Sequence, residues 1–270
     1  MVNLLKSILI GLVEGITEWL PVSSTGHMIL LDEFLQLDIT PAFRELFLVV
    51  IQLGAVLAVA VIYFRRLFPF FPGTARAERK AVWTLWGKIL VSSVPAAIVG
   101  LAFDDKIDAM FFNWQTVAAA LIFYGIVFIV IERRKSASPT VTTTAGLTYK
   151  NALFIGLFQL LSLIPGTSRS GATIIGAMLL GASRGAAAEY TFFLALPVML
   201  GAGALKLLKF GFAFTSQELA ILAVGCATAF LVSLAAIKFL TGFVKKHSFT
   251  GFGIYRTALG AAVVLWFAVR

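Results

Sequence analysis

The sequence predicts an all-α polytopic integral membrane protein, built as an inverted-topology repeat with about six transmembrane helices and two re-entrant helical hairpins. Three observations predict this fold class: the composition, a set of long apolar runs, and two apolar stretches that break at a proline. Of the 270 residues, 60% are hydrophobic and only 13% are charged, and the mean hydropathy is +0.96. Soluble domains do not have this composition, so we treat residues 1–270 as a single membrane domain.

Six apolar runs are long enough to cross the hydrocarbon core of a bilayer, which takes roughly 20 helical residues. These runs lie near residues 46–64, 88–103, 114–131, 190–210, 217–239 and 253–269. The stretches 2–37 and 151–182 are also apolar, but each breaks near its middle at a proline, Pro21 or Pro165, followed by Ser, Thr and Gly. Such a break suits two half-helices that enter the membrane and return to the same side.

The charged loops predict how the spans are oriented. The basic loops are 65–88, 132–150 and 238–252, and the acidic loops are 32–45 and 104–113. Basic loops are typical of the cytoplasmic side, so we expect the first broken stretch at the outer face and the second at the inner face. Lys206 and Lys209 do not follow this charge rule, because they lie near an expected outer end of a span. Because the net charge of +9 is explained by topology, nucleic acid is not expected as a partner.

The second broken stretch resembles the first in sequence. The matching positions, 144 or 145 residues apart, are 10–12 with 155–157, Leu20-Pro21 with Ile164-Pro165, Ser24 with Ser168, and Glu45 with Glu189. We therefore predict a first repeat over about 1–131, a basic linker over about 132–150 and a second repeat over about 151–270. Each repeat has an odd number of crossings, so the second is inverted, and discontinuous helices then face each other near the midplane with a ligand between them.

The first break, EGITEWLPVSSTGH at residues 14–27, places ionisable side chains at membrane depth, where they are costly and functional by default. Glu14 and Glu18 lie four residues apart on one helical face, and both stay ionised only beside something positive. A divalent cation is the simplest partner for both carboxylates, since Mg²⁺ binds one or two carboxylates plus phosphate oxygens. A salt bridge to Arg169 or Arg256, or protonation of one glutamate, would also satisfy the pair.

The hydroxyl cluster of the same motif, Ser23, Ser24 and Thr25, precedes His27. One hydroxyl could simply cap the returning half-helix. Ser24 and His27 are three residues apart and share a helical face, so the imidazole could reach the hydroxyl, or both could reach one phosphorus. A serine or histidine nucleophile assisted by its neighbour is the corresponding chemical hypothesis.

The second break, PGTSRSGAT at residues 165–173, predicts an anion site. Its glycines permit close backbone approach, and the free N–H groups of the helix that follows attract an anion. Arg169 would add a bidentate fork for phosphate oxygens, although a structural arginine at a helix break is the plainer alternative. The repeats differ here: Glu14 aligns with Gln159, and His27 with Ala172. Together the two breaks supply what phosphoryl transfer requires.

These two motifs, with QLGA at 52–55, closely resemble the BacA/UppP family of undecaprenyl-diphosphate phosphatases, the bacitracin-resistance proteins, over essentially the whole chain. The resemblance implies a hydrolase that converts undecaprenyl diphosphate to undecaprenyl phosphate and inorganic phosphate. This recycles the isoprenoid lipid carrier of peptidoglycan synthesis, on which cell wall biogenesis and cell shape depend. It also implies a multi-pass protein of the bacterial inner membrane, often a homodimer, with a pocket open to the periplasmic side.

The resemblance further implies roles for individual residues. The family's glutamate pair, its metal ligands, falls on Glu14 and Glu18, with Mg²⁺ or Ca²⁺ as the expected cation. The catalytic set is Ser24, His27, Glu18 and Arg169, and the phosphate-binding set is Ser23, Thr25, Gly26, Gly166, Ser168, Ser170 and Thr173. We favour Ser24 as nucleophile, with His27 as base and acid, over a phosphohistidine.

The sequence departs from the family pattern at two positions. Trp19 stands where phenylalanine is usual, and Thr167 stands where an aromatic residue is frequent. Neither change removes a reactive group.

Two other classes of function remain open on the sequence. A transporter or flippase of the phosphorylated carrier lipid is one, because inverted repeats with broken helices also build secondary transporters. The other is a membrane scaffold whose polar residues merely pack helices.

Overall fold

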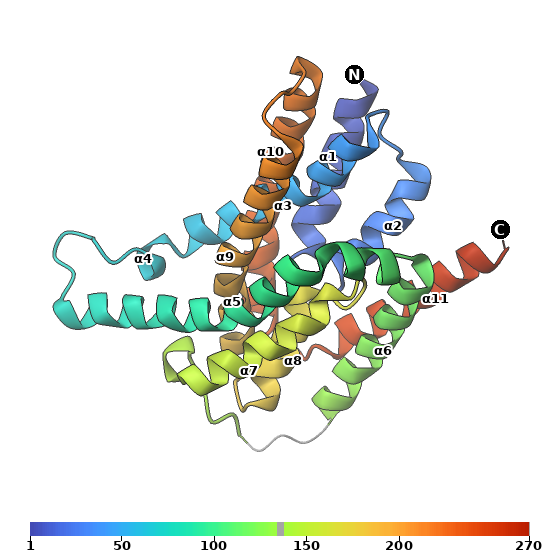
Figure 1. The fold of residues 1–270 in the computed structure, drawn as a ribbon. Coiled ribbons are helices and arrows are strands. Elements are labelled where there is room, and N and C mark those ends of the chain that lie inside the picture. Colours follow the sequence, from blue (N-terminus) through green and yellow to red (C-terminus); the bar gives the residue numbers. More distant parts are fainter. Residues whose placement is uncertain (134–137, 270) are drawn as a thin grey trace.

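The computed structural model describes residues 1–133 and 138–269, apart from the side chains at positions 104, 105 and 108. Within these ranges the chain is helical, and a single isolated bridge, between Val141 and Ala182, is the only extended pairing. The helices of the first half are α1 (Val2–Thr17), α2 (Ser24–Phe34), α3 (Pro41–Ile62), α4 (Phe64–Leu67), α5 (Arg76–Phe111) and α6 (Trp114–Arg133). Those of the second half are α7 (Tyr149–Leu160), α8 (Arg169–Leu179), α9 (Arg184–Phe210), α10 (Ser216–Phe243) and α11 (Thr250–Val269), with short 3₁₀ turns at Thr144–Gly146 and Leu161–Leu163 (Figure 1).

Six of the described helices, α3, α5, α6, α9, α10 and α11, are long and apolar enough to cross a membrane, which confirms the predicted class of an all-α polytopic membrane protein. The ends of α5 differ from the prediction. It begins at Arg76 rather than near residue 88 and runs to Phe111, so much of both predicted flanking loops is helical. Hydropathy marks only the part of a helix that lies in hydrocarbon, whereas the backbone hydrogen-bond ladder continues into polar turns beyond it.

The remaining helices form two broken hairpins, α1 with α2 and α7 with α8. At 1.5 Å per residue, the 16 residues of α1 span about 24 Å and the 12 of α7 about 18 Å, which is shorter than the roughly 30 Å hydrocarbon core. The two hairpins lie at opposite ends of the molecule (Figure 1). Each hairpin therefore reaches from its own end toward the middle of the molecule, and the two breaks meet there.

Each hairpin packs against a span from the other half of the chain. Helix α1 packs along α10, and α7 packs along α5, while α3 pairs with α9 and α6 with α11 (Figure 1). Glycines at corresponding positions allow this contact: a Cβ on Gly11 would meet the carbonyl oxygen of Gly225 at 2.6 Å, and one on Gly156 would meet that of Ser92 at 2.4 Å. The two halves are thus interlocked, and the glycines of α1 serve helix packing.

Two ion pairs join α3 and α9 at their ends. Glu45, near the start of α3, pairs with Lys206, and Glu189, near the start of α9, pairs with Arg66 just after α3. The two glutamates are the matching pair noted in the sequence, and each reaches a cation at the end of the opposite helix. The two helices are therefore antiparallel, as inverted copies require. Glu45 also neutralises Lys206, one of the exceptions to the charge rule for loops.

Candidate active site

The two breaks have the same local geometry. Ser23 and Ser168 are the only described non-glycine residues with positive φ, 71° in both, and each caps the helix that follows. The Oγ of Ser23 accepts from the N–H of Gly26 at 3.3 Å, and that of Ser168 accepts from the N–H of Gly171 at 3.1 Å. Such N-caps satisfy free N–H groups at a helix start, which offsets the strain of the left-handed backbone.

This geometry corrects the alignment of the repeats. The counterpart of Ser168 is Ser23, not Ser24 as the sequence match suggested. The second break contains one more residue between its proline and its serine, and Gly166 within it takes a φ of 92°. An offset of 144 residues at the prolines therefore becomes 145 at the caps. Ser24 corresponds instead to Arg169.

These two corresponding residues meet at one carboxylate. Ser24 Oγ donates to Glu18 Oε2 at 3.0 Å, and Arg169 Nη2 donates to Glu18 Oε1 at 3.0 Å. The side chains of Glu18 and Arg169 are only 8% and 10% exposed. Arg169 Nη1 also donates to the carbonyl of Thr191 in α9 at 3.1 Å. Of the partners considered for the glutamates, a salt bridge to Arg169 is therefore the one that Glu18 makes.

Glu14 lies one turn before Glu18 and contacts it, fully buried. Its Oε1 has no hydrogen-bond partner among the described residues, and neither amide atom of its counterpart Gln159 has one. The described residues contain no group of three or more His, Cys, Asp and Glu side chains that could hold a metal ion by itself. Two carboxylates with an unused buried oxygen nevertheless suit Mg²⁺ or Ca²⁺ if phosphate oxygens complete the shell.

His27 forms no hydrogen bond with Ser24. Its Nδ1 lies 2.7 Å from the carbonyl oxygen of Ser23, and its Nε2 lies 2.7 Å from the hydroxyl of Tyr255 in α11. Of the two arrangements that the sequence allowed, a Ser24–His27 hydrogen bond is therefore absent from this structure. The Ser23 carbonyl sits one turn before the ring and receives only a long bond, 3.4 Å, from the His27 backbone N–H, so it is free to bind the imidazole as well.

Arg256 ties the two breaks together. Its guanidinium is completely buried and donates to the carbonyls of Pro21 at 3.3 Å, Gly166 at 2.9 Å and Thr167 at 2.8 Å. It also lies over the ring of Tyr124 in α6, 5.9 Å from the centroid. On the sequence, Arg256 was considered only as a possible salt-bridge partner of the glutamates, and Tyr255 and Tyr124 were not identified. The one sequence feature that could have pointed to them is a cation inside an apolar span.

The other residues expected to bind phosphate lie around these contacts. Ser170 Oγ donates to the Leu20 carbonyl at 3.3 Å, across the two breaks, and Thr173 Oγ1 contacts Thr191 Oγ1 at 2.9 Å. Thr173 is fully buried and joins α8 to α9, so it supports the site from behind. Thr25 is half-buried in the first turn of α2, and Gly26 and Gly166 serve the cap and the Arg256 contact.

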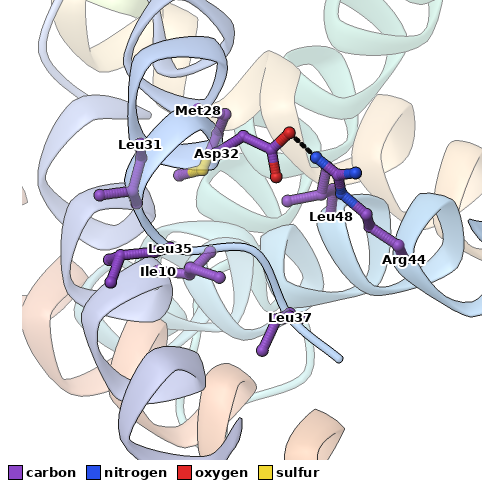
Figure 2. A pocket seen from close by; sticks show the side chains of 8 residues that line it. All are labelled: Ile10, Met28, Leu31, Asp32, Leu35, Leu37, Arg44 and Leu48. Carbon is purple, nitrogen blue, oxygen red and sulfur yellow. Dashed lines mark ion pairs between the residues drawn. The ribbon is translucent and has the colours of Figure 1, made fainter. Parts of the chain in front are cut away.

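A small hollow adjoins the first hairpin (Figure 2). Its lining residues are Ile10, Met28, Leu31, Asp32, Leu35, Leu37, Arg44 and Leu48. Most are apolar, and an ion pair between Asp32 and Arg44 closes one side (Figure 2). Met28 follows His27 directly in the chain, so the hollow begins beside the polar site.

The chain is similar to known proteins over essentially its whole length. The model of the family described as bacitracin resistance protein BacA matches residues 7–262. The chain is 55% identical to Undecaprenyl-diphosphatase 1 of Clostridium acetobutylicum over 270 residues, covering 99% of this chain and 98% of the relative. It is equally similar, at 55% over 272 residues and the full length of both chains, to Undecaprenyl-diphosphatase of Acetivibrio thermocellus. A relative of that name from Enterococcus faecalis is 55% identical over 266 residues, 97% of this chain and 96% of the relative.

Proposed function

The chain belongs to the bacitracin resistance protein BacA family, and we propose that it hydrolyses undecaprenyl diphosphate to undecaprenyl phosphate and inorganic phosphate. Its relatives over the full length of the chain are named undecaprenyl-diphosphatases. The protein is a multi-pass bacterial membrane enzyme that acts on a lipid substrate. One observation carries the assignment of the site: the Glu18 carboxylate receives Ser24 from one hairpin and Arg169 from the other.

The substrate's diphosphate would enter between the two hairpins. The first turns of α2 and α8 offer backbone N–H groups to its oxygens, and Arg169 offers a fork that matches two phosphate oxygens. When the guanidinium turns from Glu18 to the phosphate, Oε1 of the carboxylate is free for another cation, while Oε2 keeps the Ser24 hydroxyl. Oε2 of Glu18 would then accept the serine proton.

Hydrolysis then follows in two displacements. Ser24 Oγ attacks the terminal phosphorus while its proton passes to Glu18, and the bond from that phosphorus to the bridging oxygen breaks, releasing undecaprenyl phosphate. In the second step water attacks the phosphoserine, the bond from phosphorus to Ser24 Oγ breaks, and Glu18 returns its proton to Oγ. Inorganic phosphate leaves with both protons of the water, and the hydroxyl is restored. Arg169 and the helix N-termini stabilise the charge on the equatorial oxygens in both steps.

Glu14 and Glu18 would hold a divalent cation, Mg²⁺ or Ca²⁺, together with oxygens of the diphosphate. When bound, this cation would neutralise part of the substrate's negative charge. The unpartnered oxygen of Glu14 supports this proposal, since a buried carboxylate oxygen rarely lacks a partner. Chelation is expected to abolish activity, and added Mg²⁺ or Ca²⁺ to restore it. Full activity in the chelator would contradict the cation proposal without affecting the two-displacement scheme.

The isoprenoid chain would leave the site among the spans, with the apolar hollow beside α2 as its first contact (Figure 2). The basic loops on the opposite side support an opening toward the periplasm. A homodimer remains a prediction from the family resemblance. Light scattering of the detergent-solubilised protein at several concentrations would measure the mass of the complex, and a constant monomer mass would contradict it.

The test is phosphate release from undecaprenyl diphosphate by the purified protein in detergent. Ser24→Ala and Glu18→Gln are expected to lower kcat by at least about a hundredfold, the range for a positioned nucleophile or base. Ser216→Ala, which changes an exposed serine at the start of α10, is the matched control. If the folded parent releases no phosphate, the enzyme assignment fails and lipid transport in vesicles is measured next. If Ser24→Ala stays within twofold of the parent, Ser24 is not the nucleophile.

A further inference from the structure

The two ring nitrogens of His27 have partners of different chemistry. Nδ1 lies 2.7 Å from the carbonyl oxygen of Ser23, and a carbonyl can only accept a hydrogen bond. Nδ1 must therefore carry a proton. The partners of the ring are a carbonyl and a phenol, and neither brings a negative charge that would balance an imidazolium. In the neutral ring the lone pair then lies on Nε2.

The lone pair of Nε2 points at Tyr255. Its hydroxyl is 2.7 Å away, and since Nε2 has no proton, the phenol must donate and the imidazole accept. The two rings are also nearly parallel, with an interplanar angle of 12° and centroids 5.6 Å apart. Tyr255 thus fixes the plane of the imidazole and the direction of its lone pair.

Tyr255 comes from the half of the chain that lacks the acidic motif. It lies in the first turns of α11, next to Arg256, and successive helical residues point about 100° apart. Arg256 therefore reaches inward to the carbonyls of the breaks while Tyr255 stays 47% exposed beside His27. One helix turn fixes both the backbone of the breaks and the imidazole.

The hydrogen bonds separate into two sets. Ser24 donates to Glu18, which Arg169 also holds, whereas His27 is held by Ser23 and Tyr255. The imidazole is therefore not the group that holds the serine hydroxyl before substrate binds. It can act on a proton only after its Nε2 leaves the phenol.

We propose that Tyr255 is a positioning residue for His27, donating from its hydroxyl to Nε2 and keeping the lone pair covered until a phosphate group displaces the phenol. The consequence for catalysis rests on the proposed phosphatase function, but the hydrogen bond itself does not. Because Tyr255 is half-exposed at the opening, its hydroxyl can donate a hydrogen bond to an incoming phosphate oxygen in place of Nε2. The released Nε2 is then a base with the correct tautomer already set by Ser23.

The first experiment measures the tautomer and needs no activity. The chain has only two histidines, and the second, His247, is exposed in the turn after α10, so His247→Gln gives a protein with His27 alone. Nitrogen-15 NMR of this protein, labelled at histidine in detergent, is expected to show the proton on Nδ1, the minor tautomer in water. A proton on Nε2 alone would overturn the proposal.

The second experiment measures how well the lone pair is covered. Diethyl pyrocarbonate attacks an unprotonated imidazole nitrogen, so its rate at His27 reports the cover on Nε2. In the His247→Gln protein, Tyr255→Phe removes the hydroxyl and keeps the stacked ring. We expect modification about fivefold faster, the change that corresponds to one hydrogen bond of about 1 kcal/mol.

The matched control is Tyr149→Phe, which removes a phenol of nearly equal exposure, 49%, at the start of α7. It is expected to leave the modification rate unchanged. Equal rates in the parent, Tyr255→Phe and Tyr149→Phe would overturn the proposal. With undecaprenyl diphosphate as substrate, Tyr255→Phe should lower kcat, because the imidazole loses its orientation, and should also raise KM, because the phosphate loses its contact with the phenol. Tyr255→Leu, which also loses the stacked ring, should lower kcat further. An unchanged kcat in both would refute the positioning role even if the hydrogen bond is real.

Discussion

Replacing Arg256 with methionine tests how the two breaks are held together. Methionine keeps an unbranched apolar stem but has no donor, so the carbonyls of Pro21, Gly166 and Thr167 lose their shared partner. The bonds to Gly166 and Thr167, at 2.9 and 2.8 Å, are short, and the one to Pro21, at 3.3 Å, is long. A hydrogen bond from a charged donor contributes about 1.5 kcal/mol or more. We expect a loss of about 3 kcal/mol in the free energy of unfolding, after removal of the buried charge offsets part of the total.

The assay uses the single cysteine of the chain. Cys226 lies partly buried in α10, with its thiol near the carbonyl of Val50, so a thiol-reactive dye labels it as the protein unfolds. At 2–4 °C per kcal/mol for a chain of this size, Arg256→Met should lower the apparent Tm by about 6–12 °C at a fixed heating rate. Activity should fall by about a hundredfold, since a displacement of 1 Å in the breaks is enough for that.

Arg256→Lys separates the charge from the shape of the group. An ammonium cannot reach three carbonyls on two segments as the planar fork does, so the lysine variant should recover only part of the lost stability. Arg76→Met, which removes an exposed arginine at the start of α5, is the control and should melt like the parent. A methionine variant that melts within about 2 °C of the parent would refute the reasoning, and a lysine variant equal to the parent would show that charge alone is needed.

Three further changes test the packing and the caps. Gly54→Ala should destabilise the protein by at least about 2 kcal/mol in heat-aggregation measurements, because its Cβ would lie 2.2 Å from the carbonyl oxygen of Cys226, whereas Gly242→Ala, with open space around it, should be neutral or mildly stabilising. Ser168→Ala should cost about 1 kcal/mol, but Ser168→Gly only a few tenths, since glycine accepts the positive φ; equal melting shifts would count against the strain. Glu132→Gln should lower the Tm by several degrees, because this buried carboxylate accepts from the guanidinium at the start of α9 and from the backbone before α11; an unchanged Tm would show that the pair contributes nothing.

Hydropathy was enough to predict the six spans, but not their ends. The predicted run near 88–103 lies within α5, which extends to both sides as a helix of 36 residues with Pro95 inside it. Apolar content reports which residues meet lipid, and the polar turns that continue a helix into the interface carry no such signal. The interlocking of the halves was equally beyond the sequence, because the glycines of α1 and α7 predict a close contact without naming the partner helix.

The sequence predicted which residues meet at the site better than it predicted their individual contacts. Glu18, Ser24 and Arg169 were expected to act together, and they touch. Helical spacing allowed a hydrogen bond between Ser24 and His27, or an approach of both to one phosphorus, and the hydrogen bond is absent. Residues three apart on a helix can meet only if neither finds a better partner, and here the carbonyl of Ser23 and the phenol of Tyr255 compete for the imidazole. Tyr255 lies 228 residues away in the chain, so no local pattern could have indicated it.

The duplicated scaffold explains why one carboxylate can serve two hairpins. In each repeat a serine with positive φ caps a half-helix, and the next residue lies in the first turn of that helix. The next residue is Ser24 in one copy and Arg169 in the other, and both reach Glu18 at 3.0 Å. If both copies had kept the serine, the site would have two hydroxyls and no cation for phosphate. If both had kept the arginine, it would have no nucleophile at this position. Symmetry of the backbone thus delivers two side chains to one point, and the difference between the copies makes that point suited to phosphoryl transfer.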